Sequence, residues 1–310
     1  MKELIAPIDR TLLESELNDW LFIRDTNNGS NKIFIVDAYN APNTLKEIGR
    51  LRELTFRNAG GGTGLDCDLD EYDTSGTVYS QLIVWNPIDR EIIGGYRFIE
   101  CGRADRNPDG GIRLATAELF SFSEKFINEY MPYTIELGRS FVQPRYQPSS
   151  ENRKGLFSLD NLWDGLGAII VDYPHIKYFF GKVTMYSQFD GMARDYILSF
   201  INHLFPDNEK LANPLHPLPV INDMSAFMSE IDGLPYKDAH RILNGKVRDR
   251  GENIPPLFNS YMNLSSTMKT FGTSRNNHFG DVEETGILVT IADIYDSKKD
   301  RHIVSYKKAP

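Results

Sequence analysis

Cysteines, long apolar runs and an excess of basic residues are all absent or scarce in this 310-residue sequence. The two cysteines, Cys67 and Cys101, lack metal-site spacing, so we expect unpaired thiols in a reducing compartment. No apolar run approaches the roughly 20 residues that cross a bilayer, and residues 1–17 do not resemble a secretory signal. A net charge of −9 argues against nucleic acid as a partner. We therefore expect a cytoplasmic protein, at most peripheral to a membrane.

Common motifs for phosphate, calcium and hydrolysis are missing too. The glycine cluster at residues 60–64 is not followed by the Lys-Ser/Thr of a P-loop. The acidic residues that alternate from Asp66 resemble the start of a calcium loop, but Glu71 and Thr77 stand where Gly and Glu are required. The histidines are scattered, and there is no G-x-S-x-G elbow. The acidic run that begins at Asp66 is therefore expected to be a solvated loop or a looser cation site.

Hydrophobic periodicity predicts an α/β class with a largely antiparallel first half. Turn residues between two β-rich runs predict a hairpin, and Thr44 and Glu47 have the spacing of a capping box for a helix that Gly60 ends. The predicted strands are residues 32–37, 78–85, 91–99, 133–142, 176–185 and 286–294. The predicted helices are residues 44–58, 119–130, 158–173, 190–204, 226–244 and 256–270.

Four groups of residues occur in an order that resembles a known family. They are Arg52 with Phe56, Asp70 with Asp73, Gly94 and Gly95 with Arg97, and Glu136 with Gly138 and Arg139. With Leu162-Trp163 and the segment 255–257, this order resembles the acyl-homoserine-lactone synthase branch of the GNAT acyltransferases. It is more similar to the ornithine-lipid and glycine-lipid N-acyltransferases, sometimes called hemolysin-like. The resemblance covers about residues 33–294, and the missing tryptophan after Phe56 counts against a lactone synthase.

The resemblance implies a GNAT fold: a mixed, mostly antiparallel twisted sheet flanked by helices, with a helical insertion before the last strand. We expect one domain, with an N-terminal lead at residues 1–30, a core at 31–212, and C-terminal helices and the final strand at 213–310. No permanently bound cofactor and no metal are expected.

The resemblance also implies an N-acyltransferase. The donor would be an acyl carrier protein or CoA thioester carrying a long fatty acyl group, with or without a 3-hydroxyl. The acceptor would be the amine of an amino acid such as glycine, ornithine or serine. The product would be a lyso-aminolipid, which a downstream O-acyltransferase would complete.

Glu136, Arg139 and Arg97 are the predicted catalytic residues. An amine must be neutral to attack, so a carboxylate such as Glu136 or its water accepts the proton. Glu136 as a buried ion-pair partner of Arg139 or Arg97 is an equal alternative. Positions 136 and 139 face opposite sides of a regular strand, so joint use requires a bulge near Gly138. Such a bulge would also free backbone N–H groups for an oxyanion.

Acceptor binding is predicted at Arg52, Phe56, Asp70 and Asp73. Arginines can hold a carboxylate bidentately while aspartates fix the arginines or the amine. The alternative is an arginine–aspartate network that only clamps the helix and loop onto the sheet.

The phosphopantetheine arm of the donor is assigned to a loop and a helix start. Unpaired N–H groups at the first turn of a helix that begins near Ser158 can bind a phosphate. The preceding loop adds a local positive patch; the alternative is a solvated loop. The predicted residues are Arg145, Arg153, Lys154, Gly155 and Ser158.

Two rival functions stay open at this point. One is an acyl-homoserine-lactone-type synthase, which would require S-adenosylmethionine. The other is a catalytically silent GNAT-like binding module that associates with acyl carrier protein and forms no amide.

Overall fold

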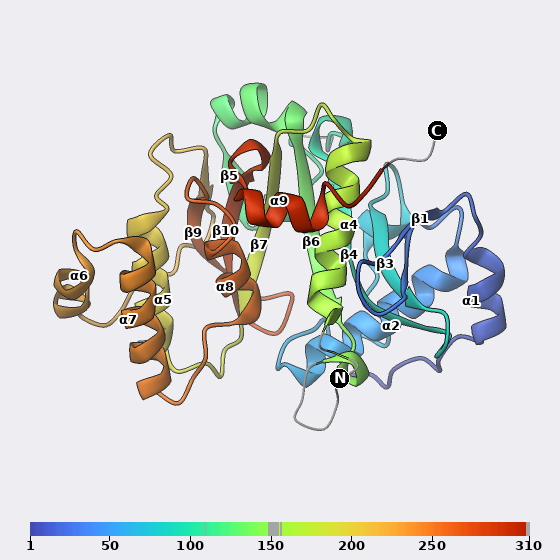
Figure 1. The fold of residues 1–310 in the computed structure, drawn as a ribbon, viewed down its shortest axis with the longest axis horizontal. Coiled ribbons are helices and arrows are strands. Elements are labelled where there is room, and N and C mark those ends of the chain that lie inside the picture. Colours follow the sequence, from blue (N-terminus) through green and yellow to red (C-terminus); the bar gives the residue numbers. More distant parts are fainter. Residues whose placement is uncertain (109, 148–154, 156, 308–310) are drawn as a thin grey trace.

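An eight-stranded sheet forms the centre of the computed structural model, which describes residues 1–310 except 109, 148–154, 156 and 308–310 (Figure 1). The strand order is β1-β2-β3-β4-β6-β7-β10-β9, and every neighbouring pair is antiparallel except β6 with β7. A separate two-stranded sheet pairs β5 (Phe120–Phe122) with β8 (Ala212–Pro214). The main strands are β1 Phe22–Asp25, β2 Lys32–Val36, β3 Ser80–Asn86, β4 Glu91–Glu100, β6 Thr134–Val142, β7 Tyr178–Met185, β9 Lys269–Asn276 and β10 Val282–Thr290.

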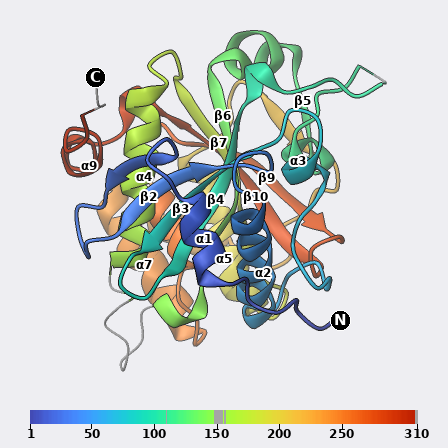
Figure 2. The ribbon, with the colours of Figure 1, turned by 90° about the vertical axis from the view of Figure 1, so that its right-hand side faces the viewer.

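Helices cover both faces of the sheet. Because successive strand residues point to opposite faces, Ile33 packs in the cluster that contains α4, and Phe34 packs in the cluster that contains α2. Figure 2 shows α4 and α2 on opposite sides of the sheet. The helices are α1 Arg10–Glu16, α2 Pro42–Asn58, α3 Glu71–Thr74, α4 Ser158–Asp172, α5 Gly191–Leu204, α6 Ser225–Ile231, α7 Tyr236–Asp249, α8 Pro256–Met262 and α9 Asp296–His302.

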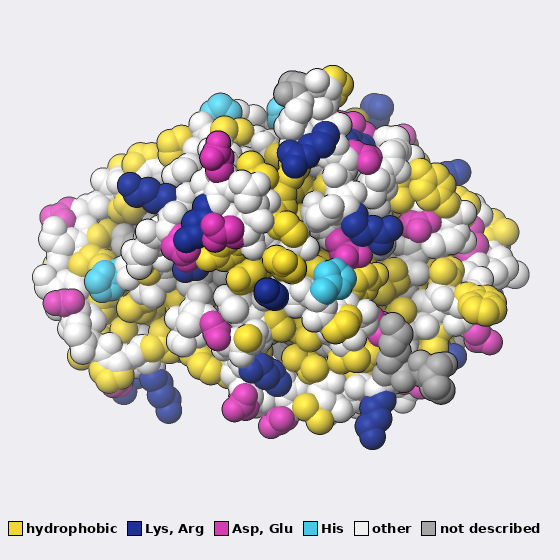
Figure 3. Space-filling view, turned by 90° about the horizontal axis from the view of Figure 1, so that it is seen from above, with side chains coloured by type: hydrophobic (Ala, Val, Ile, Leu, Met, Phe, Trp, Pro, Cys, Tyr) yellow, Lys and Arg dark blue, Asp and Glu magenta, His cyan; other side chains and the backbone are white. Residues whose placement is uncertain are grey.

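Charges of both signs share the face of the molecule that is seen from above (Figure 3). On that face, basic and acidic side chains are interspersed, with apolar side chains between them. None of the helices in the described ranges is long and apolar enough to cross a bilayer.

The predicted fold class is confirmed. β3 and β4 form the predicted antiparallel hairpin, and α6, α7 and α8 are the helical insertion before the last strands. The sheet takes strands from all three predicted parts of the chain, since β1 lies in the lead and β9 and β10 lie after residue 213.

Two predicted helices are wrong in part because distant strands capture their residues. The segment 119–130 forms β5, which pairs with β8, followed by a π-helix at Phe126–Tyr130. The segment 256–270 is helical only in α8, and β9 begins at Lys269 because it pairs with β10. The segment 226–244 divides into α6 and α7 at Gly233, whose φ of +69° suits glycine.

The predicted capping box is also wrong. α2 begins at Pro42, with Ala41 before it and no side-chain cap. The backbone N–H and hydroxyl of Thr44 instead donate to Glu16, at 2.7 and 2.8 Å, so this helix start is capped from outside. The predicted end at Gly60 is confirmed, since its φ is +93°.

Candidate active site

The glycine cluster at residues 60–64 is a structural loop closed by a carboxylate. Glu53, which is fully buried on α2, accepts hydrogen bonds from the Thr63 N–H at 3.0 Å, the Thr63 hydroxyl at 2.8 Å and the Gly64 N–H at 2.7 Å. These donors are therefore occupied. A Cβ added to Gly280 would lie 3.0 Å from the Gly61 Cα, so the loop packs tightly on the β9–β10 turn.

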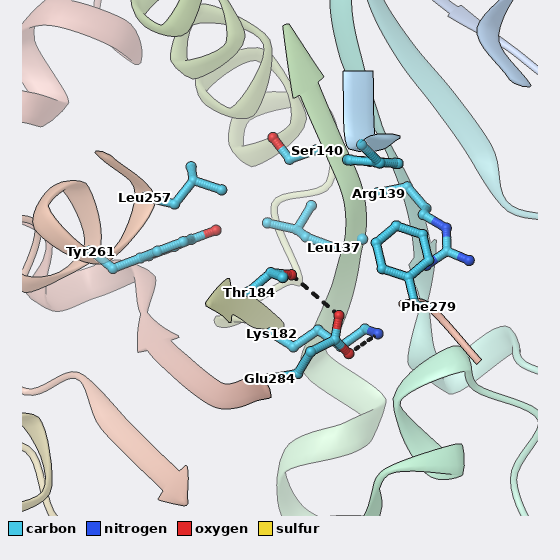
Figure 4. Close-up of a pocket in the computed structure, with 11 residues that line it drawn as sticks. Leu137, Arg139, Ser140, Lys182, Thr184, Leu257, Tyr261, Phe279 and Glu284 are labelled. Carbon is cyan, nitrogen blue, oxygen red and sulfur yellow. Dashed lines mark hydrogen bonds and ion pairs between the residues drawn. The ribbon is translucent and has the colours of Figure 1, made fainter. Parts of the chain in front are cut away.

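The sheet divides between its two parallel strands. β6 and β7 pair only from Thr134 with Tyr178 to Leu137 with Gly181, although both strands continue for several residues. The pocket that opens in this split has about 540 Å³ of empty space, its mouth included (Figure 4). Its wall consists of Phe56, Leu137, Gly138, Arg139, Ser140, Lys182, Thr184, Leu257, Tyr261, Phe279 and Glu284.

The bulge predicted near Gly138 is confirmed. Two steps along β4, from Arg97 to Gly95, face three steps along β6, from Gly138 to Phe141. Arg139 takes the strained φ of +50° at this point. The extra residue turns Arg139 away from α4, onto the face of the sheet that also carries Glu136.

Arg52 and Arg97 are buried and form ion pairs with the carboxylates of Asp68, Asp70 and Asp73. The Arg52 Nε lies 3.0 Å from Asp68, and its two other nitrogens lie 3.3 Å from Asp73. The Arg97 Nη1 lies 2.7 Å from Asp70 and 3.1 Å from Asp73. Burial alone would raise the pKa of Asp73, but the two guanidinium groups hold it well below its ordinary value. Both arginines therefore lie behind the pocket wall rather than in it.

Arg139 is the network arginine that reaches the pocket. Its Nε lies 3.1 Å from the Asp68 carboxylate, and its guanidinium stands 4.3 Å from the centre of the Phe279 ring. Phe56 packs edge-on against that ring at 5.0 Å, so these two aromatic residues and Arg139 form one corner of the pocket.

Glu136 is a buried carboxyl group one residue before the pocket wall. It is 1% exposed and accepts hydrogen bonds from the Thr116 N–H at 3.2 Å and the Thr116 hydroxyl at 3.0 Å. Burial raises its pKa to about 7, against the opposing effect of Arg97. Within the described residues it forms no ion pair, so the ion-pair alternative with Arg139 or Arg97 is wrong. A carboxyl group with this pKa can exchange protons near neutrality.

The β7 side of the split carries a charged pair that the sequence analysis did not predict. Lys182 contacts Glu284 of β10, and that carboxylate also accepts hydrogen bonds from Thr184 and Asn276, both at 3.2 Å. Lys182 and Thr184 alternate with apolar residues in the predicted strand 176–185, and this polar alternation was the sequence signal that could have indicated the pair.

A second, apolar pocket continues from the split toward α4. Its wall consists of Tyr96, Leu137, Ser140, Leu159, Leu162, Trp163, Leu166, Leu257 and Tyr261, four of which also line the split. Burial raises the pKa of Tyr261 to about 12. The buried hydroxyl of Tyr96 has no hydrogen-bond partner within the described residues.

Three of the five residues predicted for phosphopantetheine lie in the described part of the structure. Ser158 begins α4 as predicted, but it is buried, and its hydroxyl donates to the Tyr146 carbonyl at 2.9 Å. Arg145 is exposed and lies 2.6 Å from Glu91. Gly155 is buried. Arg153 and Lys154 lie outside the described residues.

Comparison with known proteins gives matches over the whole chain. A family model described as an acetyltransferase (GNAT) domain matches residues 51–153. Two curated proteins named glycine N(alpha)-acyltransferase are each 50% identical to this chain. The one from Phocaeicola vulgatus aligns over 308 residues, 99% of this chain and 94% of its own. The one from Bacteroides thetaiotaomicron aligns over 306 residues, 99% of this chain and 91% of its own.

Two solved structures are similar at lower identity. The N-acyl amino acid synthase FeeM, from uncultured soil microbes, is 8% identical with a TM-score of 0.41, covering 89% of this chain and 95% of its own. The CoA-dependent acyl-homoserine lactone synthase BjaI is 11% identical with a TM-score of 0.37, covering 87% of this chain and 89% of its own.

Proposed function

The chain belongs to the GNAT acyltransferase family of the two glycine N(alpha)-acyltransferases, and we propose that it transfers a long fatty acyl group from a thioester to the amine of glycine. The product is an N-acylglycine, a single-chain aminolipid to which a second, O-linked acyl chain can be added by another acyltransferase. Since such a product is amphipathic, its release favours contact with a membrane surface.

One observation supports this proposal above the others: the split between β6 and β7 joins a charged face of the sheet to an apolar one. Arg139, Lys182 and Glu284 line the split, and the apolar pocket under α4 continues from it. An acyl transfer to an amino acid needs such a pair of compartments, one for a zwitterion and one for an alkyl chain. The carbonyl carbon belongs where they meet, beside Leu137 and Gly138.

The chemistry assigned to the site is aminolysis of the thioester. The neutral amine attacks the carbonyl carbon, a C–N bond forms, and the C–S bond breaks to release a thiolate, which takes up a proton from Glu136 or from solvent to become the free thiol. The surplus proton of the amine goes to Glu136, directly or through a water, because that carboxyl group has a pKa of about 7. Backbone N–H groups at the bulge beside Gly138 are the assigned donors to the carbonyl oxygen in the tetrahedral intermediate.

The arginine–aspartate network is assigned a mixed role. Arg139 and Phe56 contact the acceptor, since both line the pocket. Arg97 and Arg52 with Asp70 and Asp73 hold the bulge and the acceptor side in place, since burial keeps these arginines behind the wall.

The donor is proposed to enter past the first turn of α4, with its phosphopantetheine phosphate near Ser158, Gly155 and Arg145 together with Arg153 and Lys154. Acyl carrier protein and CoA both present this arm. The Tyr96 hydroxyl, which has no hydrogen-bond partner among the described residues, suits an acyl chain that carries a hydroxyl group of its own.

The test is a direct assay with the purified protein. Glycine is incubated with hexadecanoyl or 3-hydroxyhexadecanoyl thioesters of acyl carrier protein and of CoA, and products are identified by mass spectrometry. N-acylglycine and free thiol in equal amounts support the proposal. Parallel reactions with ornithine, serine and S-adenosylmethionine test other acceptors, and a lactone made only with S-adenosylmethionine, or carrier-protein binding without amide, would contradict it.

A further inference from the structure

We propose that Lys182 and Arg139 bind the carboxylate of the amino-acid acceptor together, one from each side of the split. The inference rests on the proposed N-acyltransferase function and assigns a substrate-binding role to Lys182. It predicts that the enzyme selects amines that carry an adjacent carboxylate.

The first argument comes from the charges that can reach an acceptor. Among the described residues, the pocket wall carries two cations, Arg139 and Lys182, and one anion, Glu284. Arg52 and Arg97 are 0% and 3% exposed, and neither lines the pocket. A carboxylate entering the pocket therefore has these two wall cations as its partners.

The second argument is the way in which Lys182 is held. Its side chain is 11% exposed, and Glu284, 2% exposed, is fixed by Thr184 and Asn276 as well as by the ammonium group. An ammonium group has three donors, so contact with Glu284 leaves donors for a ligand. A buried ion pair adds little stability by itself. Its placement in the pocket wall therefore points to binding.

The third argument is direction. Arg139 stands on β6 and Lys182 on β7, and in Figure 4 both cationic ends lie on the Phe279 side of Leu137, away from Leu257 and Tyr261. A carboxylate has two oxygens, one for each cation. Held in this way, an α-amino acid has its amine one carbon from the clamp and facing the opening at Leu137, where the thioester is placed.

The experiment removes the charge from the protein and from the acceptor in turn. Rates with glycine and glycinamide are measured for wild type and Lys182→Met at a saturating acyl thioester, and kcat/KM is expressed per neutral amine. Losing one charge-assisted hydrogen bond is expected to lower kcat/KM for glycine by about 10- to 100-fold, mainly through KM. For glycinamide, kcat/KM should change about two-fold or less. The ratio of kcat/KM for glycine to that for glycinamide should therefore fall by nearly the whole loss seen with glycine.

Two further variants guard the interpretation. Lys182→Met leaves Glu284 buried without its partner, so Lys182→Met combined with Glu284→Gln provides a neutral pair that should fold and show the same loss of preference. Lys177→Met is the matched control. Lys177 is exposed just before β7 and lies over the Tyr133 ring, and its loss should leave kcat/KM unchanged with both substrates.

The outcomes separate this inference from the proposed function. Equal losses for glycine and glycinamide, or an unchanged preference in the neutral pair, would overturn the carboxylate clamp while acylation stands. If wild type acylates no amine, the proposed function fails. Saturation-transfer NMR of glycine and glycinamide then decides the clamp: glycine binding that Lys182→Met removes supports it, and binding that the variant leaves intact overturns it.

Discussion

Leu137 and Gly181 are the last residues at which β6 and β7 pair, and a Cβ added to Gly181 would lie 2.9 Å from the Leu137 carbonyl oxygen. The glycine thus permits the close approach of two strands immediately before they separate. Both compartments of the proposed site begin at this point.

Gly181→Ala should therefore widen or twist the split. Relief of the contact requires a shift of the β6 backbone, which we expect to lower the free energy of unfolding by about 1–3 kcal/mol. The same shift should lower the rate of acyl transfer to glycine at least ten-fold. Chemical denaturation and the glycine assay measure the two effects. Gly245→Ala in α7, where an added Cβ meets nothing within 4 Å, is the control and should be neutral or stabilising. Full activity in Gly181→Ala would contradict this role.

Glu136 should give acyl transfer a pH dependence centred near pH 7. If the ionised carboxylate accepts the amine proton, the rate per neutral amine rises with pH and levels off above about 7. Glu136→Gln should remove that limb and lower kcat by about 100-fold or more. If Glu136→Gln still shows the rise in rate up to pH 7, that rise belongs to another titrating group.

The same carboxyl group should also make stability depend on pH. Its folded pKa of about 7 lies above its ordinary value of 4.5, so the folded state holds a proton that the unfolded state has lost between these values. Its contribution is fully present below pH 4.5 and is lost as pH rises through 7, a change of about 3 kcal/mol. Urea titrations should show this decline in wild type and not in Glu136→Gln; parallel curves would argue against the raised pKa.

Arg52 and Arg139 should separate stability from catalysis. Arg52→Gln removes the buried guanidinium that pairs with both Asp68 and Asp73, leaving Asp68 only Arg139 and Asp73 only Arg97 as cationic partners among the described residues, and we expect it to cost about 3–5 kcal/mol of unfolding free energy. Arg139→Gln, at the pocket, should cost less stability and raise KM for glycine. Denaturation midpoints and acceptor kinetics for both variants provide the check, and the reverse pattern would place the acceptor elsewhere.

Tyr96→Phe should remove a hydroxyl group that contributes nothing to the stability of the unliganded protein. That buried hydroxyl has no partner among the described residues, so the melting temperature should stay the same or rise. With 3-hydroxyacyl donors kcat/KM should fall about three- to ten-fold, while unsubstituted acyl donors should be unaffected. Tyr130→Phe, whose hydroxyl binds Glu209 outside the pocket, is the control. Equal effects on both donors would contradict this role.

Local sequence signals were sufficient for the elements that carry the site. The apolar stripe of α4, the β3–β4 hairpin and the strand with Glu136 and Arg139 all have patterns within a few residues, and the glycine at 138 indicated the bulge. The resemblance to the family added the arginines of the network with Asp70 and Asp73, but it did not predict Asp68, which lies between Arg52 and Arg139.

Long-range pairing explains what the sequence did not reveal. β9 has a polar, irregular sequence and is a strand because β10 pairs with it, while β5 depends on β8 about ninety residues later. Lys182 and Glu284 lie far apart in the chain and become a pair only through the β7–β10 register. The Lys182–Glu284 side of the pocket was therefore visible only in three dimensions, whereas Arg139 was predicted from the sequence.

A crystal structure of the protein with N-hexadecanoylglycine bound tests the central claim most directly. The account predicts the carboxylate between Arg139 and Lys182, the amide beside Leu137 and Gly138, and the alkyl chain between α4 and α8. A product that lies wholly on one face of the sheet, with no atom in the split between β6 and β7, would contradict it.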